Sequence, residues 1–327
     1  MSHSQTGQLL LLGVPGKNLD SETAKVFRRI QPGGFILFGR NIESPSQLRK
    51  LLDDLRDLSQ KEPILTIDQE GGRVSRLRLI GNEPPSAWQL TQKAFPHLIQ
   101  KHGELTGRLL RLFGFNLNLC PVLDLCLDEE ADNSLRNRCY GKTVEEVVQN
   151  ARLFNSAMRH HGILSCGKHF PGYTRAAVDP HEHLPLLALA KPDLEELEFA
   201  PFRCLKDELD TIMVGHIAIP SLEPDNATRP ASLSPTIVHT ILRQEIGFQG
   251  LIMTDDLDMG AILNFCDFES TITGALAAGC NLLMICHRIQ LAEEAVKILE
   301  KSPTDSIDKA LEPIETLRSK FQPPLQF

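Results

Sequence analysis

Residues 64–68, Ile-Leu-Thr-Ile-Asp, form a short apolar and β-branched run that ends in a carboxylate. A run of this kind predicts a buried strand. Seven further runs along the chain have the same character: Gln8–Leu12, Gly34–Phe38, Asn116–Leu123, Leu164–His169, Thr211–His216, Leu251–Thr254 and Asn281–Cys286. The sequence therefore predicts about eight strands.

Stretches with helical periodicity separate these strands. Ser46–Leu58 carries its leucines on one face, and Val144–Arg159 begins after Thr143, which has Glu146 three residues later as in a capping box. Further helices are predicted at Leu194–Leu205, Thr236–Glu245 and Asp305–Lys320.

The alternation of strands and helices predicts parallel βαβ units, and eight such units predict an α/β fold with a single (β/α)8 TIM barrel. The competing architecture is an open, doubly wound sheet, which usually has a glycine-rich phosphate turn after an early strand. Gly13-Val14-Pro15-Gly16 does not match that motif. We therefore predict one catalytic domain over residues 1–327, with no second domain.

Composition excludes several classes of partner. Of the 327 residues, 34 are Lys or Arg and 42 are Asp or Glu, which gives a net charge of −8 with no basic cluster, so we expect no nucleic-acid partner. The first residues lack a basic segment, and Leu9–Leu12 is too short for a signal peptide or a membrane span. The eight cysteines form no C-x-x-C pair and are interpreted as buried, reduced thiols. We expect a cytoplasmic protein with no membrane partner.

Polar residues occupy the ends of six predicted strands. They are Asp68-Gln69-Glu70, Asp124, Lys168-His169, His216, Asp255-Asp256 and His287. Any one of them could merely cap a following helix. Because the active site of a TIM barrel lies at the C-terminal ends of its strands, six such ends together predict a catalytic pocket.

Three kinds of chemistry fit these residues. A metal-dependent hydrolase could use His181-Glu182-His183, but this motif falls in a proline-containing loop and not on a strand. A Schiff-base enzyme could use Lys168, although its polar surroundings favour a role in binding a substrate hydroxyl. Glycoside hydrolysis needs a carboxylate near the anomeric carbon and a proton donor across from it, and Asp255 and His181 can supply these groups.

Five motifs resemble those of glycoside hydrolase family 3, in particular its short bacterial β-N-acetylglucosaminidases of peptidoglycan recycling. In chain order they are Asp68-Gln69-Glu70-Gly71-Gly72-Arg73-Val74, Lys168-His169-Phe170-Pro171-Gly172, Asp179-Pro180-His181, Arg243-Gln244-Glu245-Ile246-Gly247-Phe248 and Thr254-Asp255-Asp256-Leu257. The resemblance extends from about Gly33 to about Cys286.

The resemblance implies a role for each matching residue. Asp255 matches a nucleophile that forms a covalent glycosyl-enzyme, and His181 matches an acid/base on a loop, with Asp179 as its partner. The pocket that binds the sugar hydroxyls matches Asp68, Arg76, Arg138, Lys168 and His169. The resemblance further implies a monomer that uses no cofactor and no metal and that acts on a small glycan or muropeptide.

The loop that carries His181 departs from the family pattern. Thr174 stands where a glycine is usual, and Pro180 is an additional proline, so the loop should be stiffer. His183 is the alternative acid/base. Two alternative functions also stay open: a phosphorylase that uses the same site, because a neutral histidine would tolerate phosphate, and a barrel that binds sugar without turnover.

Other residues have weaker functional interpretations. Asp256 and Asp258 are expected to cap the following helix, and Asp124 to support Arg138 or a neighbouring loop. His216 could contact the sugar or fill the top of the barrel. Trp88 more plausibly packs its loop than stacks on a sugar.

Overall fold

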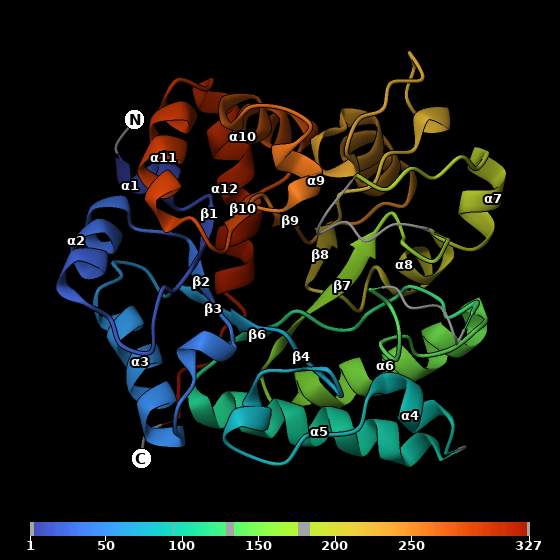
Figure 1. The fold of residues 1–327 in the computed structure, drawn as a ribbon, viewed down its shortest axis with the longest axis horizontal. Coiled ribbons are helices and arrows are strands. Elements are labelled where there is room, and N and C mark those ends of the chain that lie inside the picture. The colour runs from blue at the N-terminus through green and yellow to red at the C-terminus, as the bar shows by residue number, and fades with distance from the viewer. Residues whose placement is uncertain (1–2, 94, 129–133, 176–183, 326–327) are drawn as a thin grey trace.

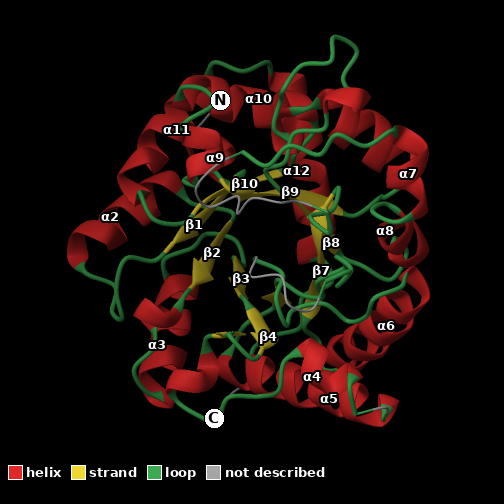
Figure 2. Ribbon diagram, turned by 45° about the vertical axis from the view of Figure 1, so that its right-hand side comes forward, coloured by secondary structure: helices red, strands yellow, loops and turns green. Residues whose placement is uncertain are grey.

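The computed structural model describes residues 3–93, 95–128, 134–175 and 184–325. Its eight parallel strands close into a barrel in the order β1-β10-β9-β8-β7-β6-β3-β2, with helices around the outside (Figure 2). The strands are β1 (Leu10–Gly13), β2 (Gly34–Leu37), β3 (Ile64–Ile67), β6 (Leu117–Asn118), β7 (Leu164–Phe170), β8 (Thr211–Val214), β9 (Leu251–Asp256) and β10 (Leu282–Ile285). Each overlaps a predicted strand, so the predicted (β/α)8 barrel is confirmed.

The outer layer consists of helices of different lengths. The longer ones are α2 (Ser21–Ile30), α3 (Pro45–Asp57), α5 (Pro96–Phe113), α6 (Val144–His160), η5 (Thr236–Glu245), α10 (Phe268–Ala278), α11 (Ala292–Glu300) and α12 (Thr304–Arg318). The shorter ones are α1 (His3–Gly7), α4 (Ala87–Thr91), α7 (Lys191–Glu196), α8 (Ala200–Leu205), α9 (Gly260–Leu263) and the 3₁₀ turns η1 (Gly39–Asn41), η2 (Leu77–Leu79), η3 (Pro220–Leu222), η4 (Ala231–Leu233) and η6 (Ile289–Leu291).

Local sequence explains where several helices begin and end. The predicted capping box is present at α6, where the Thr143 hydroxyl accepts the amide hydrogen of Glu146 and the Glu146 carboxylate accepts that of Thr143. The single helix predicted over Leu194–Leu205 is wrong, because the chain forms α7 and α8 with a break between them. Pro201 lies in the first turn of α8, where its missing N–H and its ring disfavour a continuous helix through the preceding residues.

The first and last strands complete the barrel. Leu10, Leu11 and Leu12 pair in parallel with residues 283–285 of β10, and β1 also pairs with β2. In Figure 1 the last helices, in orange and red, accordingly lie against the first ones, in blue, and α11 packs on α1 and α2. All eight strands are buried almost throughout, which explains their continuous apolar sequences.

A two-stranded antiparallel hairpin follows β3 and was not predicted. It consists of β4 (Gln69–Gly71) and β5 (Val74–Ser75). Gly71 has φ = 110°, and a Cβ atom at this position would lie 2.3 Å from the carbonyl oxygen of Pro85. Only glycine fits such a position without strain. The hairpin brings the residues that follow Asp68 back over the C-terminal end of the barrel.

None of the helices in the described ranges combines the length and the apolar character needed to cross a membrane.

Candidate active site

A pocket with a volume of about 490 Å³ opens at the C-terminal ends of the barrel strands. Six of the eight predicted site residues line it: Asp68, Arg76, Arg138, Lys168, His169 and Asp255. They come from the ends of β3, β7 and β9 and from the segments that follow β5 and β6, so residues far apart in sequence meet at one mouth. The other two, Asp179 and His181, lie outside the described residues, as does His183.

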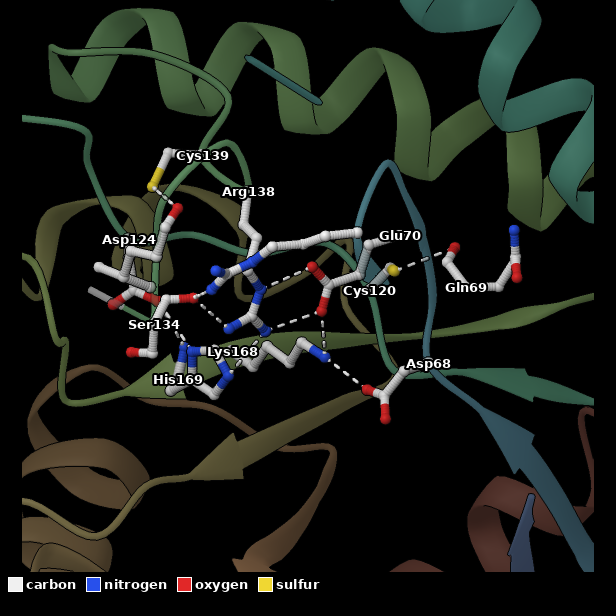
Figure 3. A network of polar contacts seen from close by, with 12 residues as sticks. Asp68, Gln69, Glu70, Cys120, Asp124, Ser134, Arg138, Cys139, Lys168 and His169 are labelled. Atoms are coloured by element: carbon white, nitrogen blue, oxygen red, sulfur yellow. Dashed lines mark hydrogen bonds and ion pairs between the residues drawn. The ribbon is translucent and has the colours of Figure 1, made fainter. Parts of the chain in front are cut away.

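The base of the pocket is a chain of alternating charges (Figure 3). The ammonium group of Lys168 lies 2.7 Å from Oδ1 of Asp68 and 2.7 Å from Oε1 of Glu70. Nε and Nη2 of Arg138 each donate to the Glu70 carboxylate at 2.8 Å, a bidentate geometry. Nη2 of Arg76 lies 3.5 Å from Oδ2 of Asp68. Each charged group of this network therefore has at least one partner of opposite sign.

These contacts fix the protonation states of the network. Burial alone would raise the pKa of Glu70, but Arg138 and Lys168 outweigh burial and hold that pKa far below its ordinary value. Burial likewise disfavours the charged form of Lys168, yet the carboxylates of Asp68 and Glu70 raise its pKa above the ordinary value. A Schiff-base lysine must lose its proton at neutral pH. Lys168 is instead held protonated, which argues against the Schiff-base alternative.

His169 is oriented by Asp124. Oδ2 of Asp124 lies 2.9 Å from Nδ1 of His169, which places the ring proton on Nδ1 and makes Nε2 the acceptor. That Nε2 atom is 3.4 Å from Nη2 of Arg138. Asp124 also accepts the amide hydrogens of His169 and Tyr173, at 3.2 and 2.6 Å. The expectation that Asp124 supports a neighbouring loop is thus confirmed.

Asp255 is the penultimate residue of β9, and its half-buried side chain lines the pocket. Its Oδ1 atom accepts the amide hydrogen of Asp256 at 2.8 Å. This bond holds the carboxylate in one orientation at the end of a rigid strand.

The predicted helix-capping role of Asp256 and Asp258 is wrong. Asp256 accepts the amide hydrogens of Asp258 and Cys286, and Asp258 accepts those of His287 and Arg288 as well as Nε–H of Arg288. Both carboxylates therefore hold the segment after β10 at the end of β9 by accepting its backbone amide hydrogens. Burial, aided by the charges of Asp258 and Asp255, raises the pKa of Asp256 to about 7.

His216 and Trp88 contribute to packing. His216 is fully buried; its Nδ1 lies 2.8 Å from the Ser232 hydroxyl and its Nε2 lies 2.9 Å from the carbonyl oxygen of Asp256. Trp88 lies in α4, where Nζ of Lys142 is 5.7 Å from its ring centre. Neither is among the described residues that line the pocket. His216 thus fills the top of the barrel, the second of its two predicted roles.

Glu70 is the functional residue that sequence reasoning did not assign. It is 5% exposed and connects Lys168 to Arg138. A signal was present in the sequence, because in an extended chain residues two positions apart point to the same side, and Glu70 follows Asp68 by two. Phe38, Arg73 and His287 also line the pocket without having been predicted to bind substrate.

The described part of the chain contains no group of three or more His, Cys, Asp or Glu side chains placed to hold a metal ion. The metal-hydrolase alternative depended on His181 and His183, which lie outside that part. It is therefore not tested by this geometry.

Comparisons with known proteins agree with the barrel and with its motifs. The sequence model of the glycosyl hydrolase family 3 N-terminal domain matches residues 2–317. A β-hexosaminidase of Pseudomonas aeruginosa is 33% identical over 293 residues, which are 89% of this chain and 86% of the relative. A β-hexosaminidase of Nitrosomonas eutropha is 32% identical over 298 residues, 89% of this chain and 84% of the relative.

Solved structures show the same likeness. A family 3 β-N-acetylglucosaminidase from Paenibacillus sp. str. FPU-7 superposes with a TM-score of 0.92 at 29% identity, covering 98% of this chain and 62% of that longer chain. A family 3 glycosyl hydrolase from Mycobacterium smegmatis gives a TM-score of 0.88 at 26% identity, and the superposition covers 99% of this chain and 98% of the Mycobacterium chain. With a family match over nearly the whole sequence and relatives above 30% identity over most of it, this chain belongs to glycosyl hydrolase family 3 and is a glycoside hydrolase.

Proposed function

We propose that this enzyme is a retaining exo-β-N-acetylhexosaminidase that releases terminal β-linked N-acetylglucosamine from peptidoglycan fragments. The observation that carries the proposal is the placement of Asp255 in the same pocket as the buried Asp68–Lys168–Glu70–Arg138 network. Charged groups with fixed positions suit the recognition of sugar hydroxyls, and a carboxylate beside them suits attack on the anomeric carbon. The names of the β-hexosaminidase relatives support the choice of sugar.

In this mechanism Asp255 is the nucleophile. Its Oδ1 atom is held by the amide hydrogen of Asp256, so we assign the attack to Oδ2. The bond from Oδ2 to the anomeric carbon forms while the glycosidic bond breaks, and the departing oxygen takes a proton from the acid. A water molecule then attacks the anomeric carbon, gives its proton to the same group, now a base, and releases Asp255. Two inversions return the β configuration.

The charge network binds and orients the sugar. Lys168 has three N–H donors, of which two are directed to Asp68 and Glu70, so the third can donate to a substrate hydroxyl. His169 can accept a hydrogen bond from a substrate hydroxyl at Nε2, since Asp124 fixes its Nδ1 proton. Arg76 and the remaining carboxylate oxygen of Asp68 lie at the edge of the same pocket. Glu70 acts through Lys168 and Arg138 and is a positioning residue.

We assign the acid/base role to His181, with Asp179 as its partner. Histidine titrates near neutral pH without help, and a neutral imidazole does not repel the Asp255 carboxylate as a second carboxylate would. The described start of this loop is anchored: Tyr173 donates its amide hydrogen to Asp124, and its hydroxyl accepts the amide hydrogen of His216 at 2.5 Å. Asp124 also orients His169, which lines the pocket, so this anchor lies beside it.

A panel of p-nitrophenyl glycosides tests the proposed function. The β-N-acetylglucosaminide should be cleaved far faster than the β-glucoside or the β-xyloside, and the rate should not depend on added phosphate. A preference for the β-glucoside would overturn the substrate assignment, and formation of sugar 1-phosphate would identify a phosphorylase instead. Binding of N-acetylglucosamine without turnover of any glycoside would identify a sugar-binding barrel. Release of N-acetylglucosamine from purified muropeptides then tests the natural substrate class.

A further inference from the structure

A second cavity, with a volume of about 470 Å³, lies beside the β4–β5 hairpin, between α5 and residues 77–85. We call it the rear cavity, and Figure 1 shows β4 and α5 as neighbours. Its apolar lining includes Leu77, Ile80, Leu98, Leu105, Leu109 and Phe113. Its size is that of a small-molecule site, and it contributes nothing to the proposed catalytic mechanism.

Three buried polar side chains line the rear cavity, Gln69, His102 and Thr106, and among them His102 is the one with buried side-chain polar atoms that lack a described partner. This side chain is 6% exposed, and neither of its ring nitrogens has a hydrogen-bond partner among the residues that the structure describes. Its ring packs against Phe154, with ring centres 5.3 Å apart, and its Cε1 would lie 2.9 Å from a Cβ on Gly71. Leaving two polar atoms buried without partners costs free energy, which a ligand that bonds to them would recover.

The charge state of the cavity indicates which ligands it can accept. Burial lowers the pKa of His102 to about 4, so at neutral pH the imidazole is uncharged and offers one donor and one acceptor. Two charged residues at the edge are already paired: Lys101 with Glu104 at 3.0 Å, and Glu83 with Arg78 at 3.5 Å. Nothing in this lining therefore compensates the charge of an ionised ligand.

Two leucines at the opening remain partly in water. Leu105 and Leu109 are each 46% exposed, although both line the cavity. An apolar ligand would cover them and gain the free energy of removing their surfaces from water. The rear cavity thus combines a mostly apolar lining, two partly exposed leucines at its opening and the unpartnered ring of His102.

We propose that the rear cavity is a binding site for a neutral small molecule with an apolar body and one hydroxyl group, and that the hydroxyl forms a hydrogen bond with His102. A hydroxyl group both donates and accepts, so it fits either tautomer of the ring. Gly71 follows Glu70 directly, so the ligand would lie beside the strand that carries the active-site network.

The test uses 4-propylphenol as the probe and the full chain with its histidines labelled with ¹³C at Cε1. Titration should shift one histidine resonance, absent in His102→Phe, with a dissociation constant on the order of 1 mM or below, as expected for a ligand of this size. The isostere 4-propyltoluene has a methyl group in place of the hydroxyl and should bind about tenfold more weakly or worse, because the ring nitrogen is left unpaired.

Two exposed leucines of α5 provide matched variants. Leu109→Glu places a charge in the cavity and should abolish binding of 4-propylphenol, whereas Leu112→Glu, on the same helix but outside the cavity lining, should leave it unchanged. Saturating N-acetylglucosamine should not displace the probe. The proposal is overturned if no histidine signal moves at 5 mM probe (about five times the expected constant), if 4-propyltoluene binds equally well, if Leu109→Glu binds like Leu112→Glu, or if the sugar competes.

Discussion

Nζ of Lys168 lies 2.7 Å from Oε1 of Glu70, and both side chains are almost fully buried. This pair joins β7 to the β4–β5 hairpin across the mouth of the barrel. The hairpin has only a short ladder of its own, and this contact and the bidentate bond from Arg138 to the same carboxylate add to the hydrogen bonds between Gln69 and Asn118 that hold it.

Glu70→Gln should therefore lower the free energy of unfolding by about 3–5 kcal/mol at pH 7, because it leaves two buried cations undercompensated. Urea denaturation measures this change. Glu22→Gln, which breaks an exposed pair with Lys25, is the control and should cost less than about 1 kcal/mol. A similar small effect for both variants would contradict the structural importance of Glu70.

The difference between wild type and Glu70→Gln should also depend on pH. The folded-state pKa of Glu70 is lowered from the ordinary 4.5. Its stabilisation is thus fully present above that value and is lost as the pH falls below it, towards the folded-state pKa. The free energies of unfolding of the two proteins should converge as the pH falls from about 5. A constant difference down to pH 3 would show that Glu70 is not ionised in the folded protein.

Asp255→Ala should keep the fold and lose on the order of 10⁴-fold or more in turnover, as expected when a covalent nucleophile is removed. A 2-fluoro sugar with an activated leaving group should label Asp255 in the wild-type protein, and peptide mapping by mass spectrometry identifies the labelled residue. Label on the adjacent Asp256 would show that the assignment of the nucleophile to Asp255 is wrong.

The first-formed sugar should have the β configuration. A covalent intermediate requires two displacements at the anomeric carbon, and their inversions cancel. Proton NMR recorded within the first minutes of hydrolysis distinguishes the anomers before mutarotation mixes them. Initial α product would mean that water attacks directly, with Asp255 as its base.

His181→Ala should slow substrates with poor leaving groups severely and activated aryl glycosides much less, because the latter leave without protonation. Azide should restore part of the rate by replacing the base-assisted water in the second step. Asp179→Asn should show a milder form of the same leaving-group dependence. If both substrate types slow equally and azide has no effect, His181 is structural, and His183→Ala becomes the next variant to assay.

Glu198→Gln should stabilise the protein in neutral solution. Burial and the charge of Asp124 raise the pKa of Glu198 from 4.5 to about 7. A carboxyl group with a raised pKa reduces stability as the pH rises through this interval, by about 3 kcal/mol at most, after which the effect is constant. Urea denaturation between pH 4 and 8 should show a flatter profile for Glu198→Gln than for wild type. Exposed Glu196→Gln is the control and should follow wild type.

The position of Glu198 also explains a glycine. A Cβ on Gly172 would lie 2.2 Å from Oε2 of Glu198, and Gly172 has φ = 128°. Both facts require glycine there. The buried carboxyl therefore lies directly beside Gly172, at the start of the segment that leads to His181.

The barrel could be predicted from sequence because its strands are buried on both faces. Such strands are continuous apolar runs. They can be recognised from their own residues alone, as at Leu251–Thr254 and Asn281–Cys286. The β4–β5 hairpin was missed because Gly71 and Gly72 interrupt the pattern, and their positive φ angles are set by contacts with residues 85–86 that follow later in the chain.

Six of the eight predicted site residues line one pocket, but the contacts among them were not predicted. Strand-end position and family motifs identified the residues around the pocket, since both are local features. The pairing of Glu70 with Lys168 and Arg138 spans 98 and 68 positions (168 − 70 and 138 − 70) and depends on packing that a linear pattern does not contain. The roles of Asp255, His181 and Asp179 stay predictions that the experiments above test.

The closure of the barrel by β1 and β10 also bears on how the chain is made. The partner of Leu10–Leu12 on one side is residues 283–285, which are synthesised 273 positions later in the chain (283 − 10). Until then the nascent chain carries two unpaired apolar strand edges, on β1 and on β9, and such edges favour aggregation. Most strands that supply the pocket precede β10, which itself adds Met284 to the lining, so the enzyme's demand for chaperone protection should be greatest just before β10 emerges.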